Sequence, residues 1–391
     1  MSGRSRAAAT VADARHMRRA LALAQRGLGR TSPNPPVGAV VVKDGRVVGE
    51  GWHRRAGTDH AEVVALAAAG ERARGATLYC TLEPCSHHGR TPPCAPRVAA
   101  AGIRRAVVAT ADPNPRVRGR GLAALRRAGI AVATGVEERA ARELIAAFAH
   151  HVRTGKPLVR LKLAASADGR IATRSGRSRW ITGPPARALV HRWRDEHDAV
   201  LVGVGTVLAD DPQLTCRRRG GRDPVRIVVD SRLRTPSAAR LLDGTGGPVW
   251  VATTSRAGAA ARARLARRGA TVLVVPGRGD RVDLGALFRM LGRRDIVSVL
   301  AEGGGDVAAA LLAGGHVDEL RCFTAPLLVG GDGIPMVGSL GIDEMDRALR
   351  LSDVRVQAVG RDWLWIARPA RPSGRARAAA PRPRPSGRRA R

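Results

Sequence analysis

Apolar and polar positions follow two different periods along the first 150 residues. Two apolar runs between Val37 and Trp52 flank the turn KDGR at 43–46, and an Asp-Gly pair between such runs predicts a β-hairpin. The residues after His60 have helical apolar spacing as far as Gly75, and TLYCTL beyond them is typical of a strand. We expect the pattern to continue with helix 97–101, strand 106–110, helix 121–128, strand 130–134 and helix 137–150. Such alternation predicts an α/β domain with a largely parallel sheet.

A break in this pattern separates a second series of elements from the first. Gly and Pro interrupt the periodicity between Arg153 and Pro157 and predict a linker there. Apolar runs then predict seven more strands, with helices between several of them: 158–163, 199–203, 226–230, 249–252, 271–275, 297–301 and 319–325. The final residues are rich in Arg and Pro and contain no acid, a composition typical of disorder. We therefore divide the chain into a flexible N-terminus (1–12), a first α/β domain (13–152), a second α/β domain (153–368) and a disordered tail (369–391).

The charge of the chain raises the question of a nucleic-acid partner. The formal net charge is +34, but the arginines are dispersed and lysine occurs only three times. Aromatic residues make up 3% of the chain, which leaves few platforms on which bases stack. We therefore expect no nucleic-acid partner. Because the sequence has neither a run of about 18 apolar residues nor a secretory signal, we expect a cytoplasmic protein without a membrane partner.

The five cysteines, an odd number spread thinly, favour metal or catalytic use over a disulfide framework. His60-Ala61-Glu62 is followed by TLEPCSHHGRTPPC, which ends at Cys94. As ligands, His60, Cys85 and Cys94 suit Zn²⁺ and leave its fourth tetrahedral position for water, as a catalytic site requires. Zinc lowers the pKa of such a water to roughly 7, and Glu62 is placed on the same helical turn as His60 to carry the proton. The pattern predicts a zinc nucleobase deaminase, although eight residues separate the two cysteines where the short signature has two.

These residues have plainer interpretations. His60 could cap a helix and each cysteine could be a small core residue, but the order of the residue types and the Pro84-Cys85 pair together favour the metal site. His87 and His88 are either competing ligands or solvated loop side chains. Asn34 either contacts a ribose or base, or forms a turn between its two neighbouring prolines.

Several motifs together resemble one known family. HAE at 60–62, TLEPCSHHGRTPPC and ADPNPRVRGRG resemble the deaminase half of the bifunctional riboflavin-biosynthesis deaminase and reductase, whose long cysteine spacing matches this chain. LKLAASADGRIA, SRWITG, GTVLADDPQLT, IVVDS and AEGGG resemble its reductase half, so that the resemblance covers about residues 13 to 368. It implies an N-terminal cytidine-deaminase-like three-layer α/β domain followed by a dihydrofolate-reductase-like α/β domain.

The resemblance also implies two activities. The first domain of that family removes the 2-amino group of 2,5-diamino-6-ribosylamino-4(3H)-pyrimidinone 5′-phosphate. The second reduces the ribosyl chain of the product with NADPH, giving 5-amino-6-ribitylaminouracil 5′-phosphate. One zinc ion per chain, NADPH, a phosphorylated pyrimidine substrate and a homo-oligomer are therefore implied. The alternative is a deaminase of another base or nucleoside with a non-functional C-terminal domain, which the intact AEGGG and VLADDP segments argue against.

A glycine-rich turn marks a candidate cofactor site in the second domain. The predicted strand 297–301 runs into EGGG at 302–305 and a helix, which places backbone N–H groups at the positive end of a helix dipole, where phosphate binds. By resemblance, the residues that contact NADP are Ala164, Trp180, Thr206, Asp210, Ser231, Gly304, Gly305, Asp306, Val307, Ala308, Ala309 and Ala310. By resemblance, the residues that contact the substrate are Ser178, Arg194, Leu214, Arg217 and Glu302.

Some of these residues carry a chemical argument of their own. Arg194 and Arg217 can pair with the substrate phosphate, because guanidinium groups bind phosphate bidentately. Because the chain is rich in arginine, each of the two could instead be an ordinary surface residue. Trp180 could instead belong to the core, and Asp210 could instead form a turn. The sequence identifies no proton donor in this domain and does not itself distinguish NADPH from NADH.

Overall fold

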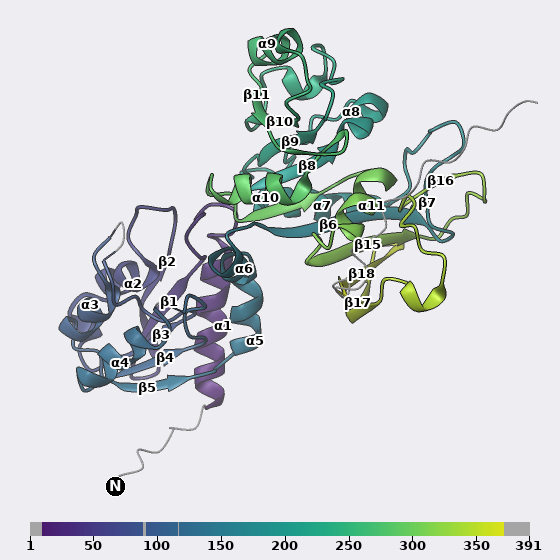
Figure 1. The fold of residues 1–391 in the computed structure, drawn as a ribbon. Coiled ribbons are helices and arrows are strands. Elements are labelled where there is room, and N and C mark those ends of the chain that lie inside the picture. The colour runs from purple at the N-terminus through teal and green to yellow at the C-terminus, as the bar shows by residue number, and fades with distance from the viewer. Residues whose placement is uncertain (1–9, 89–90, 116, 371–391) are drawn as a thin grey trace, which may run out of the picture.

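The computed structural model describes residues 10–88, 91–115 and 117–370. Within these ranges the chain forms two α/β domains, each built on its own sheet (Figure 1). Most of the terminal segments 1–12 and 369–391, for which we predicted flexibility and disorder, lies outside the described residues. The first helix nevertheless begins at Val11 and the last strand ends at Pro369, so ordered structure extends slightly into both segments.

The sheet of the first domain is mixed. Its strands are β1 (Gly38–Lys43), β2 (Arg46–Trp52), β3 (Thr77–Cys80), β4 (Arg105–Val108) and β5 (Ala131–Thr134). They lie in the order β2-β1-β3-β4-β5. The predicted hairpin forms between β1 and β2, with Asp44 and Gly45 both at positive φ in the turn. Since β1 is antiparallel to both of its neighbours, only β3, β4 and β5 give the parallel arrangement that the alternation predicted.

Helices cover both faces of this sheet and make three layers. The helices are α1 (Val11–Gln25), α2 (Ala61–Ala69, continued by a 3₁₀ turn at Gly70–Ala73), α3 (Cys94–Ala100), α4 (Arg120–Arg127), α5 (Glu138–Leu144) and α6 (Ala146–Thr154). Helices α1 and α5 pack on the face that includes Val40, whereas α2, α3 and α4 pack on the face that includes Val41. This is the three-layer arrangement that the resemblance implies. Helix α1 is an element that the sequence analysis did not identify; a capping box of Thr10 and Asp13 starts it.

The second sheet has nine strands in the order β11-β10-β9-β8-β14-β6-β15-β18-β17. In chain order the strands are β6 (Leu158–Ser166), β8 (Ala199–Gly203), β9 (Val225–Val229), β10 (Val249–Thr253), β11 (Thr271–Val274), β14 (Ser298–Ala301), β15 (Glu319–Ala325), β17 (Leu351–Val359) and β18 (Asp362–Pro369). The first seven in spatial order are parallel, and the sequence predicted all seven. The antiparallel hairpin of β17 and β18 was not predicted. Two short pairs stand apart: β7 (Arg170–Ala172) with β16 (Ile334–Pro335), and β12 (Gly277–Arg278) with β13 (Arg281–Val282).

Helices also cover both faces of the second sheet. They are α7 (Pro184–Glu196), α8 (Val204–Asp210), α9 (Ala259–Arg267), α10 (Leu284–Gly292) and α11 (Gly305–Ala313), with 3₁₀ turns at Arg240–Leu242 and Met345–Arg347. Helices α10 and α11 share one apolar core with the sheet, and α7, α8 and α9 share the other. The predicted linker begins inside a helix, because α6 runs to Thr154 before Gly155 ends it at positive φ. Within the described ranges, no helix combines the length and apolarity needed to cross a membrane.

Candidate active sites

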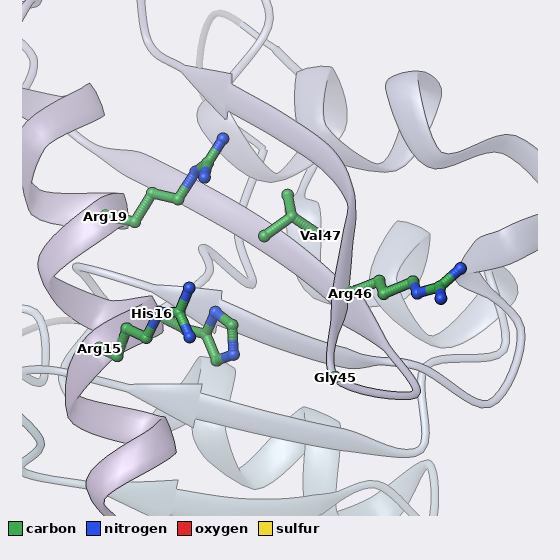
Figure 2. Close-up of a pocket in the computed structure, with 6 residues that line it drawn as sticks. All are labelled: Arg15, His16, Arg19, Gly45, Arg46 and Val47. Atoms are coloured by element: carbon green, nitrogen blue, oxygen red, sulfur yellow. The ribbon is translucent and has the colours of Figure 1, made fainter.

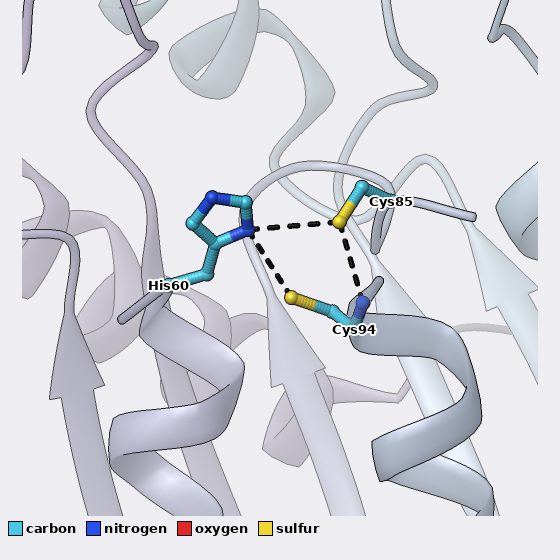
Figure 3. Close-up of side chains that lie close together, drawn as sticks. All are labelled: His60, Cys85 and Cys94. Carbon is cyan, nitrogen blue, oxygen red and sulfur yellow. Dashed lines mark hydrogen bonds between the residues drawn. The ribbon is translucent and has the colours of Figure 1, made fainter. Parts of the chain in front are cut away.

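The three predicted metal ligands meet at the N-termini of two helices. His60 is the N-cap of α2, Cys94 is the first residue of α3, and Cys85 lies in the loop between β3 and α3. His60 Nδ1 lies 3.2 Å from Cys94 Sγ and 3.6 Å from Cys85 Sγ, as Figure 3 shows. The backbone N–H of Cys94 donates to Cys85 Sγ at 3.3 Å. All three ligand atoms therefore lie within 4.8 Å of one another.

This donor set fits a zinc ion. Tetrahedral zinc with Zn–N of about 2.1 Å and Zn–S of about 2.3 Å holds its ligand atoms about 3.5 Å apart, close to the separations between His60 Nδ1 and the two sulfurs. Three protein ligands leave one position open, as in catalytic rather than structural zinc sites. The other ring nitrogen of His60 lies 3.2 Å from Thr91 Oγ1, a contact that fixes the ring. His87 and His88 are exposed and are not part of the cluster.

Hydrogen bonding makes the two thiols of the cluster unequal. The Cys94 thiol and the His60 ring both hydrogen bond to Cys85, and they lower the pKa of Cys85 to about 4. The same thiol pair, together with burial, raises the pKa of Cys94. Cys85 is therefore the first of the two to ionise, and the thiolate is the form that binds a metal.

Glu62 lies beside this cluster in the first turn of α2, where it is only 3% exposed. Burial raises the pKa of its carboxyl to about 7, against the opposing effect of His60. Its side chain is in hydrogen-bonding contact with Cys94. A buried carboxyl with a pKa near 7 can both accept and release a proton at neutral pH, which is the requirement for a proton carrier.

Glu83 stabilises the loop that carries Cys85, and the sequence analysis did not identify it. It is buried, and its carboxylate accepts four backbone N–H groups at 2.8 to 3.2 Å, those of Asp112, Gly119, Gly121 and Leu122. Glu83 thus caps the start of α4 and ties the loop that carries Cys85 to the ADPNPRVRGRG segment. Gly121 permits this approach, because a Cβ there would lie 1.9 Å from the carbonyl oxygen of Pro84. Since the partners of Glu83 are backbone groups, no pattern of residue types in the sequence predicts these hydrogen bonds.

His53 is a second residue that the sequence analysis missed. Its ring is buried, lies 5.2 Å from the His60 ring, and has Nδ1 3.1 Å from the carbonyl oxygen of Asp59. Burial lowers the pKa of His53, so the ring is neutral and its Nε2 accepts from the Asn34 amide at 3.1 Å. Asn34 also donates its backbone N–H to Thr31, so it both forms a turn and faces the site. A single histidine after a strand does not by itself predict a place beside the metal cluster, so nothing in the sequence indicated this contact.

In the second domain, the glycine turn lies between a strand and a helix as predicted. β14 leads into Glu302, Gly303 and Gly304, and α11 begins at Gly305. Side chains are excluded here: a Cβ on Gly303 would lie 2.8 Å from Val307 Cβ, and one on Gly305 would lie 2.9 Å from a carbonyl oxygen. The start of α11 packs against residues 335–338 and lies at the carboxyl end of β14, and the N-terminus of a helix in this place suits a phosphate.

The other residues predicted to contact NADP are spread around this turn. Ala164 is on β6, Thr206 and Asp210 are on α8, and Ser231 follows β9. Thr206 approaches the turn, with its Oγ1 4.0 Å from the position of a Cβ on Gly304. Along α11, Ala308 and Ala309 are buried in the core, Val307 and Ala310 are half-buried, and Asp306 is exposed.

Two of these residues have notable surroundings. Trp180 is 63% exposed, with the Arg187 guanidinium 4.5 Å from its ring, so the structure excludes a core position. Ser231 lines a cavity of about 220 Å³ together with the guanidinium-bearing Arg232 and Arg256. This cavity lies where β9 and β10 end, the edge at which parallel sheets bind ligands.

The predicted substrate residues are only partly brought together. Arg194 and Glu302 form a bidentate ion pair with N···O distances of 2.7 and 2.8 Å, and both side chains are almost fully buried. Arg217 is exposed, Ser178 is half-buried and Leu214 is buried at positive φ. The prediction that Arg194 and Arg217 jointly hold a phosphate is not tested by this arrangement, and the structure adds that Arg194 is paired with Glu302, which the resemblance also assigns to the substrate.

Lys162 is a third residue that the sequence analysis missed. It lies on β6, two residues before Ala164, and burial lowers the pKa of its ammonium group while Glu302 raises it. It is one of only three lysines in a chain that otherwise uses arginine, a signal that could have drawn attention to it. The electrostatic influence of Glu302 and Arg194 on Lys162 shows that the three charges are neighbours.

A further cavity, of about 370 Å³, lies in the first domain between α1 and the β1–β2 turn (Figure 2). It is lined by Arg15, His16, Arg19, Gly45, Arg46 and Val47. None of the predicted site residues belongs to it. The cavity between α1 and the β1–β2 turn is thus separate from the candidate zinc site formed by His60, Cys85 and Cys94.

Known protein families match both domains. The cytidine and deoxycytidylate deaminase zinc-binding region matches residues 10–110, and the RibD C-terminal domain matches residues 157–365. Riboflavin biosynthesis protein RibD of Escherichia coli (strain K12) is 44% identical over 363 residues, which cover 90% of this chain and 97% of that protein. The protein of the same name from Actinobacillus pleuropneumoniae is 43% identical over 356 residues, covering 91% of this chain and 95% of that one.

Solved structures match the whole chain as well. Acinetobacter baumannii RibD, form 1, has a TM-score of 0.82 at 40% identity and covers 92% of this chain and 99% of that chain. A diaminohydroxyphosphoribosylaminopyrimidine deaminase/5-amino-6-(5-phosphoribosylamino)uracil reductase from Thermotoga maritima has a TM-score of 0.81 at 38% identity, with the same coverage. Fold, cluster and matches define a zinc-dependent deaminase domain followed by an NADPH-dependent reductase domain. The chain belongs to the RibD family of riboflavin biosynthesis proteins, which confirms the resemblance.

Proposed function

We propose that this chain catalyses both reactions for which the Thermotoga maritima relative is named. It would deaminate 2,5-diamino-6-ribosylamino-4(3H)-pyrimidinone 5′-phosphate and then reduce the ribosyl chain with NADPH. The observation that carries this proposal is the presence of a candidate site in each of the two domains of one chain. The first is the His60, Cys85 and Cys94 cluster with a buried carboxyl beside it, and the second is the glycine turn with the buried Arg194–Glu302 pair.

Glu62 carries the proton in the proposed deamination. Zinc held by the three ligands supplies Lewis-acid activation of water. Glu62 accepts a proton from the attacking water and delivers it to the amino group at C2, so that the C–N bond breaks and ammonia leaves. Its burial supports this role, because the proton passes between Glu62 and the substrate without exchange with bulk water.

In the proposed reduction, NADPH supplies the electron pair and the protein positions the two reactants. Backbone N–H groups at the start of α11 bind a cofactor phosphate, and the residues named above on α8, β6 and the end of β9 complete its site. Two guanidinium groups beside Ser231, those of Arg232 and Arg256, suit a further phosphate monoester, such as the one that distinguishes NADPH from NADH. Arg232 would exchange its present partner Asp280, which lies 3.1 Å away in the same cavity, for that phosphate. Arg217 is exposed for the substrate phosphate, while Arg194 and Glu302 hold their end of α7 and β14 in place.

A coupled assay tests this function. Purified protein is given the diaminopyrimidine phosphate and NADPH, and ammonia release and NADPH oxidation are followed together. We expect one ammonia per NADPH oxidised and about one zinc ion per chain. Ammonia without NADPH oxidation would leave only the deaminase, and zinc-free active protein would remove the metal from the proposal. Omission of NADPH is the control, since it should stop reduction and leave ammonia release.

We also propose that the chain is a cytoplasmic homo-oligomer that joins through the hairpin of β17 and β18. Val354, Val356, Trp363 and Trp365 are all 44% to 52% exposed on this hairpin, and β17 is the edge of the nine-stranded sheet. Large exposed apolar side chains at a sheet edge favour burial against a second copy. All five cysteines are free thiols, which suits a reducing compartment. Light scattering should give a multiple of the 41.2 kDa chain mass, reduced to one chain by Trp363→Glu, and a monomeric wild type would refute the assembly.

A further inference from the structure

One segment of the deaminase domain lies between the two sites. Residues 27–34, here called the connecting segment, follow α1 and precede β1. At its ends it contacts the surroundings of the zinc cluster, since the Asn34 amide donates to His53 and a Cβ on Gly27 would lie 2.9 Å from the carbonyl oxygen of His53. In its middle it contacts helix α7 of the reductase domain. The segment therefore belongs to one domain and supports the other.

The contact with α7 is close and specific. Gly29 is at φ +69°, and a Cβ there would lie 2.2 Å from the carbonyl oxygen of Asp195, so only glycine permits this approach. The next residue, Arg30, donates through Nη2 to Asp195 Oδ1 at 2.9 Å. The same guanidinium donates through Nη1 to the carbonyl oxygen of Leu28 at 2.9 Å, which holds it in place. Backbone and side chain of the connecting segment thus both meet one residue of α7.

Asp195 is the point at which several parts of the reductase domain are joined. Its side chain is 7% exposed, so its charge depends on protein donors. Besides Arg30, it accepts from Arg218 Nη1 at 2.7 Å and from the backbone N–H of Arg222 at 2.8 Å. Both of these donors lie in the loop 215–223. A second contact joins this loop to α7, because Arg194 Nη1 donates to the carbonyl oxygen of Thr215 at 3.0 Å.

The residues held in this way include two that the resemblance assigns to the substrate. Arg194 precedes Asp195 on α7, and Arg217 lies between Thr215 and Arg218 in the held loop. The backbone N–H of Arg217 donates to His191 of α7 at 3.4 Å, so the loop follows the helix. We propose that Arg30 of the deaminase domain is a positioning residue for the reductase, because its ion pair with Asp195 fixes α7 and loop 215–223 and thereby Arg194 and Arg217. This inference rests on the proposed reductase function.

The test is Arg30→Ala in the full-length chain, assayed separately for each reaction. The KM for 5-amino-6-(5-phosphoribosylamino)uracil should rise roughly tenfold, the scale of coupling between linked sites. The kcat of reduction, the KM for NADPH and both constants of deamination should stay within about twofold. Arg30→Lys should recover part of the loss, because an ammonium group restores the charge but not both hydrogen bonds. Gly29→Ala should reproduce the selective rise, since its Cβ displaces Asp195.

Arg18→Ala is the matched control. Arg18 pairs with Glu137 within the deaminase domain and is largely exposed, so its loss should leave both reactions unchanged. An unchanged KM for the reductase substrate in Arg30→Ala would overturn the inference. So would an equal loss in deamination, NADPH binding and thermal stability, since it would mean that Arg30 only stabilises the fold. Failure of the wild-type chain to reduce its substrate would instead overturn the proposed function, and this inference with it.

Discussion

Glu62→Gln should abolish ammonia release while reduction of the preformed deaminated substrate continues at the wild-type rate. Glutamine keeps the size and the hydrogen-bonding geometry of the side chain but cannot accept and release a proton. Because Glu62 is 3% exposed, bulk water has little access to the position of its carboxyl group. We expect deamination to fall by about 100-fold to 10,000-fold, the contribution typical of a positioned acid or base. Ammonia release measures this loss, and NADPH oxidation on the preformed substrate measures the reductase.

Zinc content separates the role of Glu62 from that of the ligands. Glu62→Gln should retain about one zinc per chain, because the three ligand atoms are those of His60, Cys85 and Cys94. Cys85→Ser should lose both zinc and ammonia release. Glu71→Gln, in the exposed 3₁₀ turn after the same helix, is the matched control and should behave as wild type. Deamination above a tenth of the wild-type rate in Glu62→Gln, or loss of reduction along with it, would show that the proton carrier is misassigned or that the sites are not independent.

Glu302→Gln should remove reduction and also destabilise the reductase domain. The substitution leaves the Arg194 guanidinium buried without its carboxylate, and breaking a buried pair in this way costs about 3 to 5 kcal/mol. Burial by itself would raise the pKa of Glu302, but Arg194 outweighs it and lowers the pKa below the usual 4.5. A carboxyl with a lowered pKa stabilises the fold above that value, and the stabilisation is lost as the pH falls through the pKa of the folded state. The difference in stability between wild type and variant should therefore be full at pH 7 and shrink below about pH 4.5.

Denaturant unfolding and NADPH oxidation together check this prediction. The double variant Arg194→Met with Glu302→Gln should recover much of the lost stability, since no unpaired charge remains, but should not recover reduction. Asp332→Asn is the control, because its pair with Arg174 is exposed and should contribute less than about 1 kcal/mol. A Glu302→Gln variant that unfolds like wild type at pH 7 and reduces at the normal rate would contradict both the structural and the functional assignment.

The cysteine pair and the glycine turn show which features of the candidate sites could be predicted from short sequence motifs. Pro and Gly stand among the eight residues between Cys85 and Cys94, and both sulfurs lie close to one histidine, the convergence that this composition allowed. Likewise, the sequence predicted that EGGG forms a turn between a strand and a helix, and in the structure it joins β14 to α11. In the glycine turn the neighbours along the chain are also the neighbours in space, whereas His60 and Cys85 are 25 residues apart and meet only in the fold.

The elements that were missed depend on distant partners. Helix α1 buries Met17, Ala20 and Leu21 against the first sheet, but Arg15, Arg18 and Arg19 interrupt its apolar spacing in the sequence. In the second domain, β17 is almost wholly exposed, while β18 alternates buried and exposed positions. Glu83 takes its role from backbone N–H groups 29 to 39 residues further along the chain. The partners of His53 are nearer, and its role comes from where the fold places its ring beside that of His60.

The sequence by itself predicted two α/β domains, the zinc ligand set and a glycine turn between a strand and a helix, because each rests on a motif of residue types. The proton-carrying role of Glu62 and the phosphate-binding role of the turn stay predictions. Only the tertiary structure decided which charges are paired and which are exposed. Arg194 pairs with Glu302 within the reductase domain, and Arg30 pairs with Asp195 across the two domains although 165 residues separate them. Such pairings depend on how distant segments pack, and packing is a property of surfaces that no single stretch of sequence contains.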